Sequence, residues 1–168
     1  MKNKTEKLTH PFGAEFDAYS KILILGTFPS VKSRENMFYY GNPRNRFFKV
    51  LSALFNEEMP GDIPQKKAFL HKHHIAVFDV LRSCEICGSA DTSIKQPVPN
   101  DFSEIFREAN ICAVFTNGKK AHELYNKYCA ALLGLEAVCL PSTSPANASA
   151  SYEKLIAEWT IILNYLRV

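Results

Sequence analysis

The stretch Lys21-Ile-Leu-Ile-Leu-Gly26 decides the fold of this chain. Its consecutive apolar residues end at a glycine and predict a short strand that is buried on both faces. Strands of that kind are typical of parallel sheets whose two faces are both covered by helices. Similar apolar runs at 75–81, 111–116 and 136–140 predict further strands of the same sheet.

Segments with a helical spacing of apolar residues separate these predicted strands. They cover Asn45–Asn56, Ile63–His73, a short helix from Asp101, Lys119–Leu133 with a stop near Gly134, and a last helix capped by Ser151. A long loop is expected from Thr27 to Pro43. The alternation of strands with helices predicts an α/β fold with a parallel sheet and helices on both faces.

The length of 168 residues fits one domain, which can bury a sizeable core without a metal or disulfides. We find no internal repeat, low-complexity tract or linker that would divide the chain. We therefore expect a single domain over residues 1–168, with residues 1–15 forming a loosely ordered N-terminal segment.

Composition limits the compartment and the partners. No apolar run approaches the roughly 20 residues that span a bilayer. The polar, Lys-rich stretch Met1–Thr9 lacks the apolar region of a signal peptide. We expect a cytoplasmic protein without a membrane partner. The net charge of +3 permits an anionic partner without requiring one.

The cysteines and histidines do not form a recognisable metal motif. The chain has five cysteines, an odd count that argues against a disulfide framework when no secretion signal is present. Cys84 and Cys87 form a C-x-x-C pair, but no second pair at metal spacing follows it. His71, His73 and His74 are poorly spaced for one helix face. We therefore expect no metal site.

Unusual residues gather directly after each predicted strand. In open α/β sheets ligands bind beyond the carboxyl ends of the strands, so these residues are expected to meet at one edge of the sheet. Glycine and proline fix backbone shapes there, hydroxyl and amide groups offer hydrogen bonds, and aromatic rings offer stacking faces. The segments are Gly26–Ser30, Tyr39–Asn45, Asp79 with Arg82 and Ser83, Asn117–Lys119, and Pro141–Asn147.

Each of these residues also has an ordinary structural explanation. Loops of this fold class are rich in Gly, Pro, Ser and Asn whatever their function. Asn45 is well suited to cap the helix that follows it. Asp79 could only fix a loop, and Tyr39 and Tyr40 could be half-buried packing residues. The loops taken together, with aromatic residues in the first, favour a binding site.

Two of the segments resemble the signature motifs of a known family. Gly26-Thr-Phe-Pro-Ser30 and Ser142-Thr-Ser-Pro-Ala-Asn147 resemble the two motifs of the uracil-DNA glycosylase superfamily. The stretch Tyr39-Tyr-Gly-Asn-Pro-Arg-Asn-Arg-Phe-Phe-Lys49 resembles its mismatch-specific and hypoxanthine-DNA glycosylase branches. Phe78–Glu85 and Phe115–Ala121 are also similar to that branch.

The resemblance extends from about Lys21 to Trp159, and the order and spacing of the motifs make it specific. It implies a three-layer α/β/α sandwich with a four-stranded parallel sheet. It also implies a monofunctional DNA glycosylase that flips a deaminated or mismatched base out of double-stranded DNA and hydrolyses its N-glycosidic bond. Such an enzyme acts in base excision repair, as a monomer, and needs no metal or cofactor.

One departure from the family pattern indicates the branch. Most of the superfamily carries Asp or Asn two positions after the first motif glycine, to position or activate water, but this slot holds Phe28. The hypoxanthine branch also lacks that residue and has its catalytic amide at the position of Asn45. Ser142 stands where efficient uracil enzymes have a His that contacts the base. We therefore expect removal of hypoxanthine, with uracil as a further candidate, and catalysis by Asn45.

The other site residues follow from what a flipped base and its DNA require. Phe28 is the first candidate for a stacking face, and Tyr39 or Tyr40 is the second. The expected base-binding residues are Gly26, Thr27, Phe28, Tyr40, Asp79 and Asn117. The expected DNA-binding residues are Pro29, Ser30, Arg44, Lys119, Ser142, Thr143, Ser144, Pro145, Ala146 and Asn147, with Pro145 and Ala146 entering the minor groove.

Two other functions fit parts of the sequence. A serine hydrolase would use Ser142 or Ser144, but the chain has no G-x-S-x-G elbow and no His follows these serines. A catalytically inactive DNA- or nucleotide-binding module of the same fold is supported by Phe28 in the usual catalytic slot. Cleavage of duplexes that contain hypoxanthine, uracil or xanthine separates the enzyme from the binding module.

Overall fold

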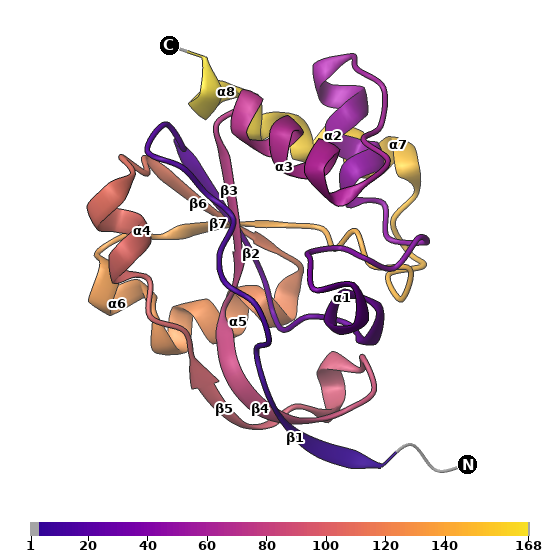
Figure 1. The fold of residues 1–168 in the computed structure, drawn as a ribbon, viewed down its shortest axis with the longest axis vertical. Helices are drawn as coiled ribbons and strands as arrows, with labels where there is room; N and C mark the ends of the chain where they lie inside the picture. The colour runs from indigo at the N-terminus through magenta and orange to yellow at the C-terminus, as the bar shows by residue number, and fades with distance from the viewer. Residues whose placement is uncertain (1–3, 168) are drawn as a thin grey trace.

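A parallel sheet of four strands lies at the centre of the molecule (Figure 1). The computed structural model describes residues 4–167. The strands β2 (Ile22–Gly26), β3 (Ile75–Asp79), β6 (Ala113–Asn117) and β7 (Ala137–Leu140) pair in the order β3-β2-β6-β7. The predicted four-stranded parallel sheet is therefore confirmed.

Helices cover both faces of this sheet, which confirms the three-layer α/β/α arrangement. Figure 1 shows one group of helices on one side and a second group on the other. The first group comprises α2 (Phe47–Phe55), α3 (Ile63–Lys72) and α7 (Tyr152–Trp159), which continues into η2 (Thr160–Ile162) and α8 (Leu163–Leu166). The second comprises α4 (Ser103–Glu108), α5 (Lys119–Tyr128) and α6 (Ala130–Leu133). No helix within residues 4–167 is long and apolar enough to cross a membrane.

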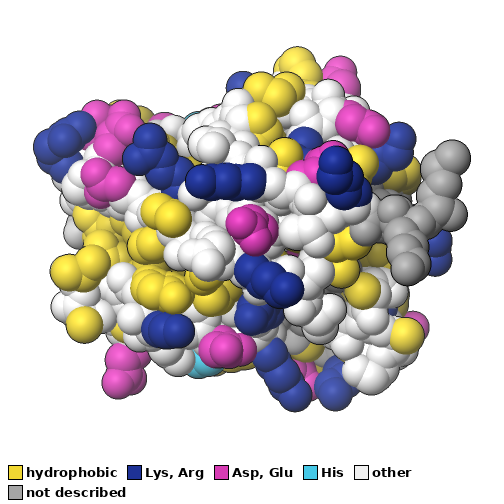
Figure 2. All heavy atoms as spheres, turned by 90° about the horizontal axis from the view of Figure 1, so that it is seen from below, with side chains coloured by type: hydrophobic (Ala, Val, Ile, Leu, Met, Phe, Trp, Pro, Cys, Tyr) yellow, Lys and Arg dark blue, Asp and Glu magenta, His cyan; other side chains and the backbone are white. Residues whose placement is uncertain are grey.

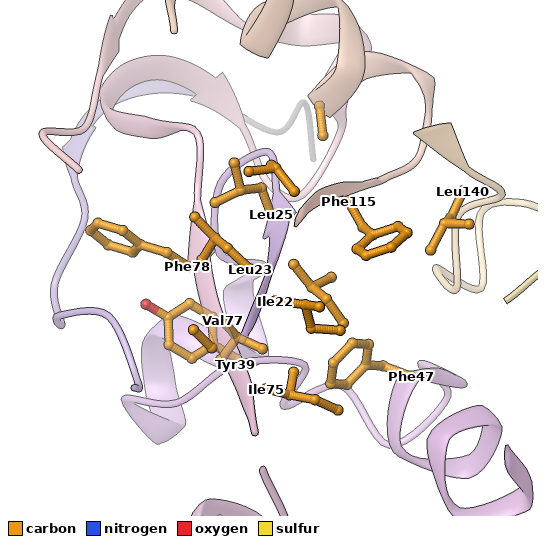
Figure 3. Close-up of a cluster of buried hydrophobic side chains, with 14 of the residues drawn as sticks. Ile22, Leu23, Leu25, Tyr39, Phe47, Ile75, Val77, Phe78, Phe115 and Leu140 are labelled. Atoms are coloured by element: carbon orange, nitrogen blue, oxygen red, sulfur yellow. The ribbon is translucent and has the colours of Figure 1, made fainter. Parts of the chain in front are cut away.

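The core forms around β2, because every residue of this strand is buried. Its side chains meet Val77 and Phe78 of β3 and Phe115 of β6, and Phe47 of α2 closes one end of the cluster (Figure 3). Burying one large aliphatic or aromatic side chain contributes about 1.5–3 kcal/mol to folding. Because both faces of β2 are buried, its sequence is a continuous apolar run from residue 22 to 25, and this run predicted the strand.

A second, antiparallel sheet was missed by the sequence analysis. It joins β1 (Thr5–Thr9), β4 (Leu81–Cys87) and β5 (Lys95–Pro99) in the order β1-β4-β5. Within the segment of residues 1–15, for which a loose order was expected, residues 5–9 thus form a hydrogen-bonded strand, and residues 1–3 lie outside the described part. Almost all of β1 is exposed, so backbone pairing rather than apolar burial holds it.

The boundaries of several elements also differ from the predictions. The expected strand at 75–81 ends at Asp79, because the chain turns there and the N–H of Val80 donates to the carbonyl of Gly26. The expected long loop contains the short helix α1 (Val31–Asn36), which Ser30 caps. Further along the chain, η1 (Asp91–Ser93) lies between β4 and β5. The stop at Gly134 and the cap at Ser151 are confirmed.

His71 ties α3 to the N-terminal segment. Its Nε2 lies 2.6 Å from a carboxylate oxygen of Glu15, and its Nδ1 lies 2.9 Å from one of Asp17. Partial burial alone would lower the pKa of His71, but the hydrogen bonds and charges of Glu15 and Asp17 outweigh it and raise this pKa. An imidazolium with both N–H groups directed at carboxylates is the form that fits this geometry.

This arrangement predicts a stability that depends on pH. A histidine whose pKa is higher in the folded chain than in the unfolded chain stabilises the fold when it is protonated. This contribution is fully present at pH values below the ordinary pKa of 6.5. The contribution is lost as the pH rises through the raised value. The difference in unfolding free energy between the parent and His71→Gln, measured by urea titration, should therefore shrink as the pH rises. A difference that is constant over this range would contradict the assignment.

Candidate active site

A cavity of about 850 Å³ opens at the carboxyl edge of the parallel sheet. Its size falls within the range of about 300–1,000 Å³ that is usual for small-molecule sites. With the single exception of Arg44, every residue proposed for the site lines this cavity. These residues are Gly26, Thr27, Phe28, Pro29, Ser30, Tyr40, Asn45, Asp79, Asn117, Lys119, Ser142, Thr143, Ser144, Pro145, Ala146 and Asn147.

Gly26 and Asp79 form one wall of the cavity. They are opposite each other in the pairing of β2 with β3, and Asp79 is only 5% exposed. A Cβ atom on Gly26 would lie 2.5 Å from Oδ1 of Asp79, which is closer than real Cβ contacts allow. Gly26 is therefore required for space, because only a residue without a side chain leaves room for this carboxylate.

His10 reaches the same carboxylate from the N-terminal segment. Its Nε2 lies 2.7 Å from Oδ2 of Asp79, and both side chains are buried. Asp79 was also considered as a residue that only fixes a loop. Its backbone carbonyl does accept a hydrogen bond from Asn100, but its carboxylate faces the cavity and His10. The site thus holds a buried, hydrogen-bonded carboxylate.

Tyr40 contributes a buried hydroxyl that has no hydrogen-bond partner among the described residues. Its ring stacks on Phe47 with centroids 3.8 Å apart, and its backbone is left-handed, with φ of 52°. Burial and the charge of Asp79 raise the pKa of Tyr40, which keeps the hydroxyl protonated, while the nearby Asn117 amide partly offsets the rise. An unpaired buried hydroxyl beside a cavity is available to a ligand.

Phe28 and Tyr39 differ from each other in their surroundings. Tyr39 donates its hydroxyl to the carbonyl of Gly13 at 2.6 Å and packs edge-on against Phe12, so it is a packing residue of the wall. Phe28 is 8% exposed and lines the cavity, with the guanidinium of Arg34 at 5.9 Å from its ring centroid. Of the two, Phe28 keeps the role of candidate stacking face.

Asn45 uses the two atoms of its amide group differently. Its Oδ1 accepts from the N–H of Phe47 at 3.0 Å, in the first turn of α2, and from the hydroxyl of Thr143 at 2.8 Å. Both lone pairs of the oxygen are thereby occupied. Asn45 lines the cavity, and its Nδ2 has no hydrogen-bond partner within residues 4–167. The N-cap position of α2 is Arg46, so the oxygen of Asn45 forms an Asx turn just before the helix and does not cap it, while its nitrogen remains a donor at the cavity wall.

A hydrogen-bonded chain links Asn45 to the end of β6. The fully buried Thr143 donates its N–H to Oδ1 of Asn117 and accepts from Nδ2 of Asn117, both at 3.0 Å. The same Asn117 amide lies near the hydroxyl of Tyr40. This chain fixes three loops relative to one another, although they are far apart in the sequence.

Arg46 holds the loop that follows β7. Its guanidinium donates to the carbonyls of Ala150 at 2.6 Å, Asn147 at 3.1 Å and Ser144 at 3.4 Å. Its backbone N–H donates to the carbonyl of Thr143 at 3.0 Å. The loop of residues 142–147, the proposed DNA-binding segment, is thus held rigidly against the start of α2.

Asp91 adds a second carboxylate to the wall of the cavity. Its Oδ2 accepts from the hydroxyl of Thr27 at 3.4 Å. Loss of hydration at this wall raises the pKa of Asp91, and the negative charge of Asp79 adds to the rise. Asp91 is less firmly held than Asp79, because it belongs to an exposed turn between β4 and β5.

The sequence analysis missed His10, Arg46 and Asp91. Arg46 directly follows the Asn-Pro-Arg-Asn stretch, but nothing in its position distinguished it from the exposed Arg44. His10 lies 69 residues from its partner, so no local pattern could connect the two. Within residues 4–167, no three His, Cys, Asp or Glu side chains are grouped so that they could hold a metal ion.

Positive charge around the cavity is modest. Lys119, at the start of α5, and Lys154 line the cavity, and Arg44 is exposed near it. The face shown in Figure 2 carries Lys and Arg side chains with acidic and hydrophobic side chains between them, and not one continuous basic surface. The charge distribution agrees with the net charge of +3.

Comparison with known proteins identifies the class. Residues 14–167 match the model of the uracil DNA glycosylase superfamily, and the chain belongs to this family of DNA glycosylases. It is 33% identical over 156 residues to a hypoxanthine DNA glycosylase of Methanosarcina acetivorans, with 92% of this chain and 97% of the relative covered. A hypoxanthine DNA glycosylase of Methanosarcina barkeri is 33% identical over 81% of this chain and 86% of its own length.

A solved structure agrees with the sequence comparisons. An NMR structure from Methanosarcina acetivorans, of a protein classed with the uracil DNA glycosylases, superposes with a TM-score of 0.79 at 32% identity. The match covers 92% of this chain and 96% of the other. Family membership makes DNA the substrate of the protein.

Arg46 and Arg44 are expected to affect different properties. Arg46→Met removes the charged donors of three loop carbonyls and should lower the unfolding free energy by about 2–4 kcal/mol. Arg44→Met alters an exposed side chain and should change stability by less than about 0.5 kcal/mol.

If Arg44 contacts a phosphate, its replacement should instead flatten the dependence of DNA affinity on salt by roughly 0.9 log units per log of salt. Urea unfolding and binding to abasic-site DNA at several salt concentrations measure both properties. Equal loss of stability in the two variants would show that the Arg46 contacts contribute nothing specific.

Proposed function

We propose that this protein is a hypoxanthine-DNA glycosylase, which hydrolyses the N-glycosidic bond of a deaminated base that has been flipped out of the duplex. The observation that carries the proposal is the convergence of three groups on one cavity. They are the carboxylate of Asp79, the unpaired hydroxyl of Tyr40 and the free Nδ2 of Asn45. The names of the two relatives support hypoxanthine as the base.

The carboxylate suits the edge that deamination creates. Adenine and cytosine have a ring nitrogen that accepts a hydrogen bond, whereas hypoxanthine and uracil carry an N–H at that position. An ionised carboxylate only accepts hydrogen bonds, so Asp79 would pair with the N–H of the deaminated base and repel the ring nitrogen of the normal one. The buried hydroxyl of Tyr40 would donate to an acceptor of the same base.

Asn45 would act as a donor rather than as a base. Its oxygen is occupied, so it has no lone pair with which to take a proton from water. Cleavage places negative charge on the leaving base, and a fixed donor aimed at that charge stabilises the transition state. The Nδ2 group of Asn45 would either donate to the leaving base or donate to the oxygen atom of the attacking water.

The loop of residues 142–147 would grip the DNA around the flipped nucleotide. Arg46 holds the loop from behind, while Ala146 is exposed at its tip beside the half-buried Pro145. A rigid tip of this kind suits insertion into the minor groove. Lys119 and Arg44 would contact phosphates, which supply affinity without sequence information. We also propose that the enzyme acts as a monomer on deaminated or mispaired bases in the cytoplasm, where its five cysteines would stay reduced.

Substrate preference tests the proposal directly. Labelled duplexes that contain hypoxanthine, xanthine or uracil are incubated with excess protein and then treated with alkali, which breaks the strand at abasic sites. Hypoxanthine should be removed faster than uracil from a U·A pair, because Phe28 replaces the water-positioning residue of uracil enzymes. Equal rates on both would overturn the branch assignment, and tight binding without any cleavage would favour the inactive module.

Asn45→Asp separates the contribution of the Nδ2 donor from that of the Oδ1 acceptor. The aspartate oxygen can still accept from Phe47 and Thr143, so the melting temperature should stay close to that of the parent. Loss of the Nδ2 donor should reduce single-turnover cleavage by roughly 10²–10³-fold. Asn42→Asp is the matched control, because it adds the same charge to a neighbouring residue of the cavity wall. If both variants lose activity equally, charge rather than the donor explains the effect.

A further inference from the structure

The N-terminal segment places one side chain against the carboxylate of the site. The imidazole of His10 is 2% exposed, and its Nε2 lies 2.7 Å from Oδ2 of Asp79. Aromatic rings of Phe12, Phe28 and Phe78 lie edge-on to it, with centroids 4.6, 5.9 and 5.7 Å away. His10 precedes the stretch of residues 14–167 that matches the family model.

The direction of this hydrogen bond follows from the other ring nitrogen. The N–H of Phe12 approaches Nδ1 of His10 at 3.4 Å, so Nδ1 is the acceptor and Nε2 carries the proton. His10 therefore donates to Asp79. The backbone of His10 is itself fixed, because its N–H donates to the carbonyl of Arg82 directly beyond the pairing of β1 with β4.

The two oxygens of Asp79 consequently have different surroundings. Oδ2 receives the proton of His10, whereas Oδ1 lies against Gly26 at the wall of the cavity. Asp79 lies within electrostatic range of Tyr39, Tyr40 and Asp91, and none of these three groups carries a positive charge. His10 is thus the only donor side chain, among the described residues, that is bonded to this carboxylate.

We propose that His10 is a positioning residue of the glycosylase site. It holds the plane of the Asp79 carboxylate and keeps Oδ2 occupied, so that Oδ1 alone is presented to the N–H of the flipped base. The inference rests on the proposed function and adds the N-terminal segment to the machinery that recognises the base. Its role runs through Asp79, since His10 does not line the cavity itself.

A purely structural role for His10 predicts a different pattern from a positioning role. As a packing residue, His10 would contribute through shape, and an apolar replacement would serve as well. As a positioning residue, it needs a donor at the place of Nε2. Gln carries its amide nitrogen at about this reach, Asn falls one carbon short, and Leu has no donor.

The test compares His10→Leu, His10→Asn and His10→Gln in single-turnover cleavage of hypoxanthine DNA. Partners that orient the ligands of a metal typically contribute roughly 10–100-fold, and we expect a comparable effect for a partner that orients a base-binding carboxylate. His10→Leu and His10→Asn should lose activity on this scale, and His10→Gln should recover a substantial part of the loss. In an Asp79→Ala background, His10→Leu should cost less than about twofold, because coupled residues are not additive. Melting temperatures show which variants are folded.

Three results would overturn the proposal. They are full activity in His10→Leu, no recovery in a folded His10→Gln, and an equal loss from His10→Leu with and without Asp79. Binding of free hypoxanthine, followed by NMR, supplies a second readout that needs no cleavage. If the parent protein cleaves no lesion, yet His10→Leu loses the base and His10→Gln keeps it, the proposed function fails and the role of His10 stands. Base binding that is unaffected by His10→Leu counts against that role.

Discussion

The pairing of Gly26 with Asp79 is the constraint on which the rest of the site depends. Parallel register between β2 and β3 brings these residues side by side at the ends of their strands. There is no room for a Cβ at Gly26, since it would lie 2.5 Å from Oδ1 of Asp79. A buried carboxylate is costly unless it is hydrogen-bonded, so this position also requires the donor that His10 supplies. The register between β2 and β3 thus explains why a glycine, a carboxylate and a histidine are needed together at this place.

The site is built before any substrate arrives, and the fold bears a cost for it. A buried hydroxyl without a partner costs about 1–3 kcal/mol. Tyr40 carries such a hydroxyl and also a left-handed backbone, which is itself unfavourable for a residue with a side chain. Stacking on Phe47 in the core offsets part of this cost and prevents the ring from turning away. A preformed donor needs no reorganisation when charge develops on the base.

The sequence predicted the parallel sheet and most of the cavity wall because both depend on local patterns. Buried apolar runs mark the four central strands, and the loops after them must meet at one edge. The antiparallel sheet was missed because β1 is exposed and polar, and its stability comes from backbone pairing that leaves no apolar period. Arg46 and His10 were missed for a related reason. Their partners are remote in the sequence, and a single polar side chain does not reveal what it will contact.

The contacts between residues that are remote in the sequence nevertheless converge on one loop, which follows β7. Asn45 reaches Thr143 and Arg46 reaches Ala150, so two neighbouring residues of one loop hold both ends of another. Asn117 joins the same network through Thr143. The proposed donor of the reaction and the proposed DNA-gripping loop are therefore fixed by the same hydrogen bonds. A displacement of this loop would therefore move the oxygen of Asn45 and, with it, the amide nitrogen of the same side chain. Under the proposed function, binding of the DNA and alignment of the Asn45 amide would be mechanically one event.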